Sequence, residues 1–574
     1  MNKGRILSLC VGLLLPMCTF AQSFDLEHIG DMFGKGKPIK VNGGLNASTV
    51  LNSGGGYSRQ PFTWFLNGNL NANLFGQLNL PFSFNLTNAG AGYAYPNMPN
   101  RLSLHPTYKG VTAHIGDVSM SFSPYTLNGH QFTGVGIDVM PESEWSVSLM
   151  YGRLLRAVDY DSTNRSVLPS YKRMGYGAKL GLMKEKYALG LSFIRAEDKV
   201  DPMQYLPDTL HIFPKANLAV SLTAMIRPRK GLEFTAEYAN SAMKLDKRDN
   251  AGVSKASGGN ILGSIFMYDQ RRTYFFKAIK AGMNYSFYKS TIGIGYERVD
   301  PGYQTLGAYY MNNDLENITV NFSQPFLKDK ANISASVGYQ RDDLNHTKSG
   351  ATSRMVSSLN ANYMPNEKFT ANFTYSNFQT YTHIKPQFEY INQTGPYVDM
   401  DTLNFKQISQ NAGLNLNYSL RVNKTKSHNI NMNLSVQDAA DIQNGVLWKG
   451  NGSRFYNSST AYTLLLIPQQ ISFTSAFNLS YNTIGRSDFL TLGPTLGLNA
   501  KLFHKKVTGG FSTSYNTSTN DGQQQGQVLN LRMNAAYLFM KKHNFNMNAV
   551  HQTRWTPKGN NSNLTATLGY NYNF

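Results

Sequence analysis

Apolar and polar residues alternate with a period of two over most of this chain. In the last block, Leu564 to Phe574, six apolar side chains fall on one face, and Asn, Thr and Gly occupy the other. The same alternation recurs over 66–74, 78–87 and 473–481. Successive side chains of a β-strand point to opposite faces of its sheet, so this period predicts strands with one apolar face. We therefore expect an all-β fold.

The composition indicates which medium the apolar face meets. Charged residues make up only 15% of the 574 residues, against about 25% in average soluble proteins. The polar face is mostly uncharged, and the 34 Tyr and 33 Phe collect near strand ends. These features favour a single transmembrane antiparallel β-barrel with lipid outside, a polar lumen and aromatic girdles. A soluble all-β protein is the alternative. An α-helical membrane protein is excluded, because no later segment approaches the ~20 apolar residues of a membrane helix.

Short and long connections alternate between the predicted strands. The short ones are basic turns such as 184–186 and 505–506, and the long ones include 242–272, 299–315 and 379–407. This pattern predicts short periplasmic turns and long extracellular loops. The segmentation yields about 26 strands over 40–574, an even number that places both termini in the periplasm. The strand at 100–106 is short and ends in Pro106, and without it the count would be about 24.

The N-terminus predicts export. Residues 1–21 combine a basic start, an apolar stretch and Ala21 at a cleavage position, which is the pattern of a secretory signal peptide. Residues 22–39 would then form a short periplasmic segment, too short for a plug domain. Residues 40–574 form the predicted barrel. The formal net charge of +20 then favours anionic lipid head groups over nucleic acid as partners.

The residue spacing reveals no catalytic or metal-binding pattern. Histidines occur at positions 105, 114, 130, 211, 346, 383 and 551, but spacing brings none of them to a particular Ser or Asp. The paired acids Asp159/Asp161 and Asp399/Asp401 lack the multi-ligand pattern of a calcium loop. Both cysteines, Cys10 and Cys18, fall within the predicted signal peptide, so the mature chain is expected to have no thiol chemistry. We expect no enzyme activity, cofactor or metal.

Four predicted strands end with an aromatic residue followed two positions later by an arginine. The pairs are Tyr151/Arg153, Phe193/Arg195, Tyr296/Arg298 and Tyr339/Arg341, and Lys277 sits comparably on a descending strand. The period of two places both members of a pair on one face, so the cations would lie above the outer aromatic girdle. Lipopolysaccharide phosphates lie at that level, and arginine binds phosphate bidentately. We predict lipopolysaccharide contact; unspecific extension of these side chains to the interface is the alternative.

The terminal strand resembles that of large outer-membrane β-barrels of Gram-negative bacteria, with Tyr570, Tyr572 and the final Phe574 in phase. This resemblance implies that the strand is an assembly signal for the barrel-assembly machinery. The Asn- and Tyr-rich composition is similar to that of Bacteroidota proteins. Lipopolysaccharide-export barrels and TonB-dependent transporters are similar in size but carry periplasmic or plug domains, which 22–39 cannot hold. No motif selects a subfamily among the secretion and accessory barrels.

The expected width of the barrel bears on function. Barrels of 16–18 strands already enclose an aqueous channel, so about 26 strands left open would make the membrane leaky. We expect closure by long loops, such as 242–272 and 379–407, or by a partner. The leading hypothesis is a non-enzymatic barrel subunit of an outer-membrane transport, secretion or assembly complex, with a lipoprotein or another complex subunit as partner. The alternatives are a self-gated passive channel for large solutes and a rim-active lipid hydrolase.

Overall fold

The structure is a computed structural model. It describes residues 39–54, 61–88, 101–140, 143–163, 169–200, 206–207, 210–248, 273–347, 353–377, 408–439, 442–443, 446–447, 452–557 and 559–574. The predicted signal peptide, nearly all of segment 22–39 and loop 379–407 lie outside these residues, as does 249–272 of the loop at 242–272. In the described part of the chain, no helix is long and apolar enough to cross a membrane.

The described strands form one antiparallel sheet. They are β1 (Ile39–Ser53), β2 (Phe62–Leu74), β3 (Leu78–Thr87), β4 (Arg101–Leu104), β5 (Thr107–Tyr108), β6 (Val111–Ser121), β7 (Asn128–Val139), β8 (Trp145–Leu155), β9 (Lys172–Met183), β10 (Tyr187–Lys199), β11 (Ala216–Arg229), β12 (Leu232–Lys244), β13 (Thr273–Phe287), β14 (Ser290–Val299), β15 (Leu315–Phe326), β16 (Ala331–Arg341), β17 (Ser353–Asn366), β18 (Phe369–Ser376), β19 (Ile408–Val422), β20 (Lys426–Ala439), β23 (Ser453–Leu466), β24 (Ile471–Ile484), β25 (Ser487–Leu502), β26 (Val507–Asn520), β27 (Gln523–Phe539), β28 (His543–Thr556) and β29 (Gly559–Asn573). A separate hairpin joins β21 (Ile442–Gln443) and β22 (Val446–Leu447).

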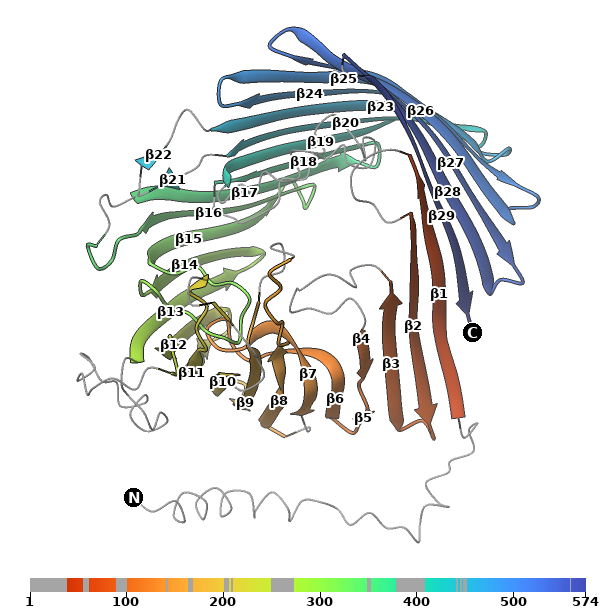
Figure 1. Cartoon of the computed structure of the whole chain (residues 1–574). Coiled ribbons are helices and arrows are strands. Elements are labelled where there is room, and N and C mark those ends of the chain that lie inside the picture. The colour runs from red at the N-terminus through yellow and green to blue at the C-terminus, as the bar shows by residue number, and fades with distance from the viewer. Residues whose placement is uncertain are drawn as a thin grey trace, which may run out of the picture.

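The sheet closes into a barrel of 26 strand positions. Both β4 and β5 pair with β3 and β6, so they are two pieces of one strand. The last strand, β29, pairs with β1, and Phe574 and Gly43 exchange backbone hydrogen bonds of 3.1 and 3.3 Å (Figure 1). Closure leaves no open sheet edge, which a lipid environment requires. The all-β class and the larger of the two predicted strand counts are confirmed.

Most strand boundaries lie within four residues of those predicted, and two regions differ in a way that needs an explanation. The strand predicted at 100–106 is interrupted, because Pro106 has no N–H to contribute to the ladder. Strand β23 begins at Ser453, five residues before the predicted start at 458, inside a segment predicted as a loop. That loop also contains the β21–β22 hairpin. The strands of this hairpin have only two residues each, which is too short for a period of two to appear in the sequence.

The two ends of the barrel differ. Short turns such as 75–77 and 327–330 join strands at one end, which we call the short-turn end. Longer connections, including 122–127, 156–171 and 300–314, lie at the opposite, long-loop end. Strand β1 starts and β29 finishes at the short-turn end, so the chain enters and leaves the barrel on one side (Figure 1).

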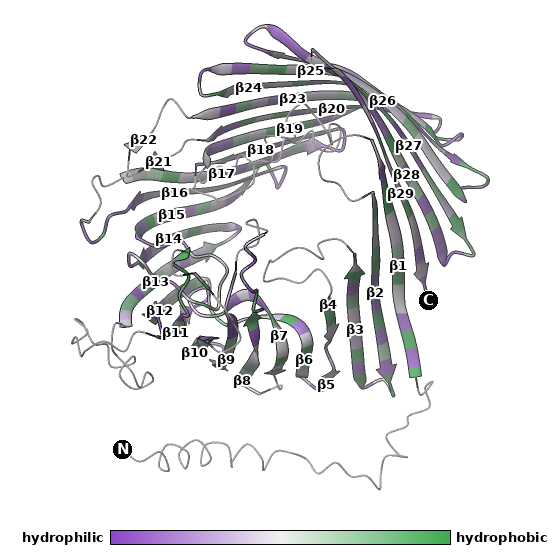
Figure 2. Cartoon of the chain, viewed as in Figure 1, coloured by the Kyte–Doolittle hydropathy of each residue, from purple (hydrophilic) through white to green (hydrophobic). Residues whose placement is uncertain are grey.

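The two faces of the wall are identified by burial. On β8, Met150 is 4% exposed and the next residue, Tyr151, is 57% exposed. Met150 joins a cluster with residues of β6, β7, β10, β11 and β12, which meet only inside a closed barrel. The exposed face is therefore the outer one. It carries large apolar side chains on successive strands, including Leu149, Leu180, Leu222, Ile294, Val320, Phe477 and Leu568. Figure 2 shows the alternating hydropathy along the strands that produces this apolar outer surface, as in membrane-spanning barrels.

Candidate functional site in the barrel lumen

Two connections at the long-loop end fold into the lumen. The first, 122–127, joins β6 to β7 and closes on itself through the Phe122 N–H, which donates to Leu127 O at 2.8 Å. Phe122 and Leu127 are buried in the cluster that includes Phe132 and Ile194 of the inner wall. The apolar side chains of this short loop therefore face the interior of the barrel rather than solvent.

The second connection, 300–314, joins β14 to β15 and meets the first. The Tyr303 hydroxyl donates to Tyr125 O at 2.9 Å, and the Thr305 hydroxyl donates to Thr126 O at 2.8 Å. The Asn128 N–H donates to Gly307 O at 2.9 Å. Tyr303 is fully buried. These bonds join segments about 180 residues apart in the sequence into one inner layer, which we call the lumen layer (122–127 and 300–314).

The inner wall also holds the lumen layer. The Leu306 N–H donates to Asn217 Oδ1 of β11 at 3.0 Å, and Asn217 Nδ2 donates to Ser241 Oγ of β12 at 2.8 Å. Ser241 in turn donates to Gln304 O. Asn217 and Ser241 are almost fully buried, and buried polar groups are stable only when paired. This network fixes the second loop against β11 and β12.

Charged side chains hold the tip of the first loop. Glu237, Lys280 and Glu297 occupy one register row across β12, β13 and β14. The Tyr125 hydroxyl donates to Glu297 Oε1 at 2.6 Å, and the Ser123 hydroxyl donates to Glu237. Burial, reinforced by the Glu297 charge, raises the pKa of Tyr125. The Tyr125 hydroxyl therefore stays protonated and remains a donor over the physiological range. This arrangement is suited to holding a loop, since both carboxylates accept bonds from hydroxyl groups of that loop.

The wall outside this region has a different character. On β26 the inward positions are Ser512, Ser514, Asn516, Ser518 and Asn520, and on β20 they are Asn429, Asn431, Asn433, Ser435 and Gln437. Neighbouring strands exchange side-chain bonds along this wall. For example, Gln552 Nε2 donates to Asn530 Oδ1 at 2.8 Å, and Asn530 Nδ2 donates to Ser514 Oγ at 3.1 Å. Strands β20 and β26 therefore present a neutral, hydrogen-bonding surface to the lumen, whereas Arg532 of β27 and Arg554 of β28 occupy inward register positions beside it.

The predicted rim arginines lie on the outer face, and they have acidic partners. Arg298 of β14 and Arg341 of β16 flank Glu316 of β15 in one register row. Glu316 accepts a bond from Arg341, lies 3.8 Å from Arg298 Nη1, and accepts the Tyr296 hydroxyl at 2.8 Å. One row toward the short-turn end, the half-buried Tyr296 lies beside the exposed Ile318, which lies beside the exposed Tyr339. Sequence reasoning missed Glu316, because its pairing depends on the register between β15 and its two neighbours.

The remaining predicted cations also lie on the outer face. Arg153 donates to the Thr133 hydroxyl at 3.3 Å, and this hydroxyl donates to Asp117 Oδ1 at 2.6 Å. Arg195 occupies the register position beside the exposed Tyr176. Lys277 is exposed, and its N–H donates to Asp300 Oδ2 at 2.9 Å. The five cations are spread over β8 to β16 and do not form one cluster.

The predicted assembly-signal residues share the outer face at the short-turn end. The rings of Tyr570 and Phe545 have centroids 4.9 Å apart, and those of Tyr572 and Phe574 have centroids 5.4 Å apart. The Tyr570 hydroxyl lies 2.8 Å from His543 Nδ1. These rings form part of an aromatic girdle at the position where a membrane interface is expected.

Two histidine sites emerge that spacing could not indicate. On the inner face, His105 Nδ1 and His114 Nδ1 lie 2.8 Å apart, and His114 Nε2 lies 2.8 Å from Asp138 Oδ2. On the outer face, His551 Nε2 lies 2.9 Å from the Ser562 hydroxyl. Within the described residues, no group of His, Cys, Asp or Glu could hold a metal ion.

The closed barrel and its apolar outer belt define a large β-barrel of the outer-membrane type. The sequence matches no protein-family model and no curated protein. It is similar in structure to OccAB3 of Acinetobacter baumannii, with 11% identity over 68% of this chain and 98% of that chain and a TM-score of 0.30. The FrpB iron transporter of Neisseria meningitidis has 11% identity over 95% and 83% and a TM-score of 0.36. An E. coli P pilus tip assembly intermediate, PapC-PapD-PapK-PapG, has 11% identity over 94% and 61% and a TM-score of 0.42. We draw no conclusion about function from likenesses this distant.

Proposed function

We propose that this chain is the barrel subunit of an outer-membrane transport, secretion or assembly complex and performs no chemistry itself. In this proposal the lumen layer closes one side of the barrel, and a partner subunit occupies the other. Both termini are in the periplasm, and the long-loop end faces the exterior.

The uneven interior is the observation that carries this proposal. The inner wall of β6 to β14 is covered by the lumen layer and its apolar cluster. The neutral inner faces of β20 and β26 lie on the opposite side of the barrel from that layer (Figure 1). Uncharged Asn, Ser and Thr side chains can bond to a polar partner without the desolvation cost of burying charges. This wall is therefore suited to an interface.

The outer surface supports contact with lipopolysaccharide in the same proposal. Arg153, Arg195, Arg298 and Arg341 share the outer face with the aromatic side chains below them. Glu316 neutralises part of this charge, so the phosphate contact is weaker than four free arginines would give. Exposed ion pairs of this kind contribute about 0–1 kcal/mol each.

Purification from membranes in a mild detergent tests the proposal. We expect a partner protein to co-purify in stoichiometric amount. Ser514→Arg with Asn516→Arg places charges on the lumen wall and should abolish this co-purification. Thr513→Arg adds an arginine to the outer face of the same strand, so it shows whether an added charge alone impairs membrane insertion. A lone, stable barrel in repeated purifications would contradict the proposed complex.

A self-gated channel for large solutes is the second candidate. The inward folding of 122–127 and 300–314 favours it, because these loops already narrow the pore without a partner. The purified barrel would then conduct ions in a planar bilayer, with a conductance that rises when the lumen layer is loosened.

A further inference from the structure

The wall between β3 and β6 is weakly joined. Strand β3 has four register pairs with β4 and one with β5, and β6 has two with each. By comparison, the closing pair β1–β29 has ten and β14–β15 has nine. Each missing pair removes backbone hydrogen bonds, so the backbone ladder of this seam contributes less free energy than the described joins around it. Side-chain contacts such as Ser83–Ser103 and His105–His114 still cross the seam.

Two prolines cause the weakness. The His105 N–H donates to Pro81 O and the Ala113 N–H donates to Pro106 O, each at 2.8 Å. Proline has no N–H, so neither bond can be returned by its partner residue. Nearby, Gly116 of β6 adopts a φ of 98°, and a Cβ there would lie 2.2 Å from Leu102 O. The ladder is therefore interrupted on both flanks of the β4–β5 strand.

The seam also marks a boundary inside the barrel. Strands from β6 onward are braced by the buried cluster, which contains Val118 and Met120 of β6. No described member of that cluster lies on β1 to β5. The other boundary of the braced region, β14 to β16, is clamped from outside by the Tyr296–Glu316–Arg341 contacts. Of the two boundaries, only the one at β3–β6 combines missing ladder bonds with an unbraced neighbour.

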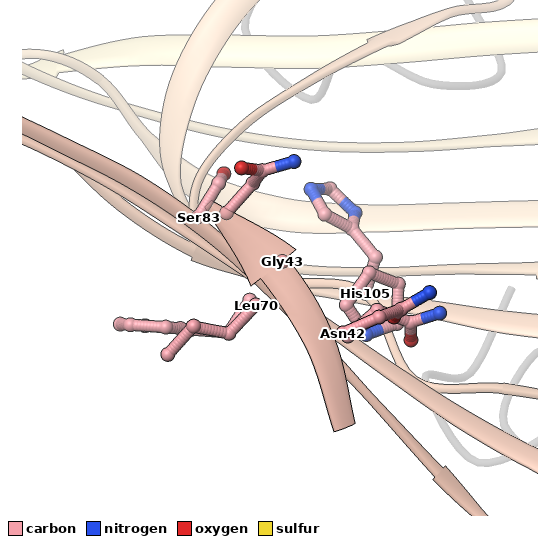
Figure 3. Close-up of a pocket in the computed structure, with 9 residues that line it drawn as sticks. Asn42, Gly43, Leu70, Ser83 and His105 are labelled. Atoms are coloured by element: carbon pink, nitrogen blue, oxygen red, sulfur yellow. The ribbon is translucent and has the colours of Figure 1, made fainter. Parts of the chain in front are cut away.

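A pocket of about 270 Å³ lies along β1 to β3 and reaches this seam at Ser83 and His105. Its polar side chains are Asn42, Asn69, Asn71, Ser83 and His105. In Figure 3, Leu70 points away from His105 and Ser83. On the outer face of the interrupted strand, Leu102 is 51% exposed. A pocket with polar side chains and the apolar outer surface thus meet at the edge of this weakly paired wall.

We propose that the β3–β6 seam is a lateral portal that admits the polar headgroup of an amphipathic lipid from the bilayer into this pocket. The acyl chains stay outside against Leu102 and its apolar neighbours. Neutral amide and hydroxyl groups inside bond to the headgroup. This proposal is independent of the proposed complex, because lipid entry at the seam requires no partner subunit.

Photolabelling of the purified full chain tests the portal. The probe is a phosphatidylethanolamine carrying a diazirine on its headgroup, in vesicles of phosphatidylethanolamine and phosphatidylglycerol. After illumination, the labelled residues are mapped by mass spectrometry. We expect labels on Asn71, Ser83 and His105, several-fold above those on the inward residues Ser323 and Ser334 of β15 and β16. A probe with the diazirine at the end of an acyl chain is expected to label the outer face only.

Locking the seam provides the decisive comparison. The Ser83 and Ser103 hydroxyls lie 2.6 Å apart across the seam, so Ser83→Cys with Ser103→Cys places two thiols for cross-linking. Ser323→Cys with Ser334→Cys, whose native hydroxyls are 2.8 Å apart, is the matched pair in a well-joined part of the wall. The only native cysteines are Cys10 and Cys18, which are replaced by Ser in all variants.

Oxidising the seam pair should abolish labelling of His105, and reduction should restore it, while the control pair leaves labelling unchanged. Pro81→Val with Pro106→Val, which returns two ladder donors, should lower labelling without any cross-link. This variant keeps the test valid if the cysteine pair does not fold. Headgroup labelling at His105 no higher than at Ser323, or labelling that survives the locked seam, would overturn the portal.

Discussion

Replacing Leu127 by alanine perturbs the lumen layer at its best-buried point. Leu127 is 0% exposed and lies in the cluster with Phe132, Ile194 and Leu306. Because the side chain belongs to loop 122–127 and not to the sheet, its removal weakens the docking of the loop while the strand ladder persists.

The magnitude follows from the burial. Truncation of a fully buried leucine costs about 2–5 kcal/mol, including the cavity that remains. If this loss acts on docking alone, the population of the released loop rises roughly 30-fold or more, since about 1.4 kcal/mol corresponds to a factor of ten. The remaining Tyr125–Glu297 bond and the contacts with Tyr303 limit the release.

Single-channel recording in planar bilayers measures the release directly. Leu127→Ala should open to a larger conductance, or open more often, than the unmodified barrel. Leu222→Ala removes the same atoms from the outer face, where the side chain is 48% exposed, and should leave the conductance unchanged. Heat-modifiable migration in gels confirms that both barrels are folded. A folded Leu127→Ala barrel with unchanged conductance would refute the docking of this loop as a closing element.

Other expectations concern the outer surface and the terminal strand. Glu316→Gln removes the acid between Arg298 and Arg341, so it should increase the lipopolysaccharide that co-purifies with the barrel. Alanine at all four arginines (Arg153, Arg195, Arg298 and Arg341) should decrease that amount. A phosphate or lipid A assay measures both, and an unchanged amount in both variants would count against phosphate contact. Deletion of Phe574 removes the Gly43 backbone bonds and an aromatic ring of the girdle, and should reduce membrane insertion at normal transcript levels; full insertion would argue against an assembly signal. The His551–Ser562 pair is expected to be inert, so a fluorophosphonate probe should label unmodified protein and Ser562→Ala equally; labelling that is lost in Ser562→Ala would instead support a rim hydrolase.

The strands could be predicted because each one reports its own environment. A residue such as Leu568 must face lipid and its neighbour Thr567 must face the lumen, so the alternation appears in the sequence itself. The same period correctly placed Arg298 and Arg341 on the face of Tyr296 and Tyr339.

The interior could not be predicted in this way. The Tyr303–Tyr125 bond joins residues 178 positions apart, and no local pattern indicates that two loops meet. From length alone, loops 242–272 and 379–407 could contribute to closure, with a partner as the more economical way to fill the pore. The described inward loops are shorter. Burial of Phe122, Leu127 and Tyr303, and not chain length, holds them in the lumen. The pairing of Glu316 likewise depends on register between strands, which turn lengths fix only approximately.

Photo-crosslinking in living cells tests the central claim most directly. A photoreactive amino acid replaces Asn516, which faces the lumen on β26, or its neighbour Tyr515, which is 40% exposed on the outer face. If a partner subunit occupies the neutral wall, position 516 should give a discrete protein adduct, and position 515 should give none of that size. A barrel that inserts normally but forms no protein adduct at 516 would contradict the account.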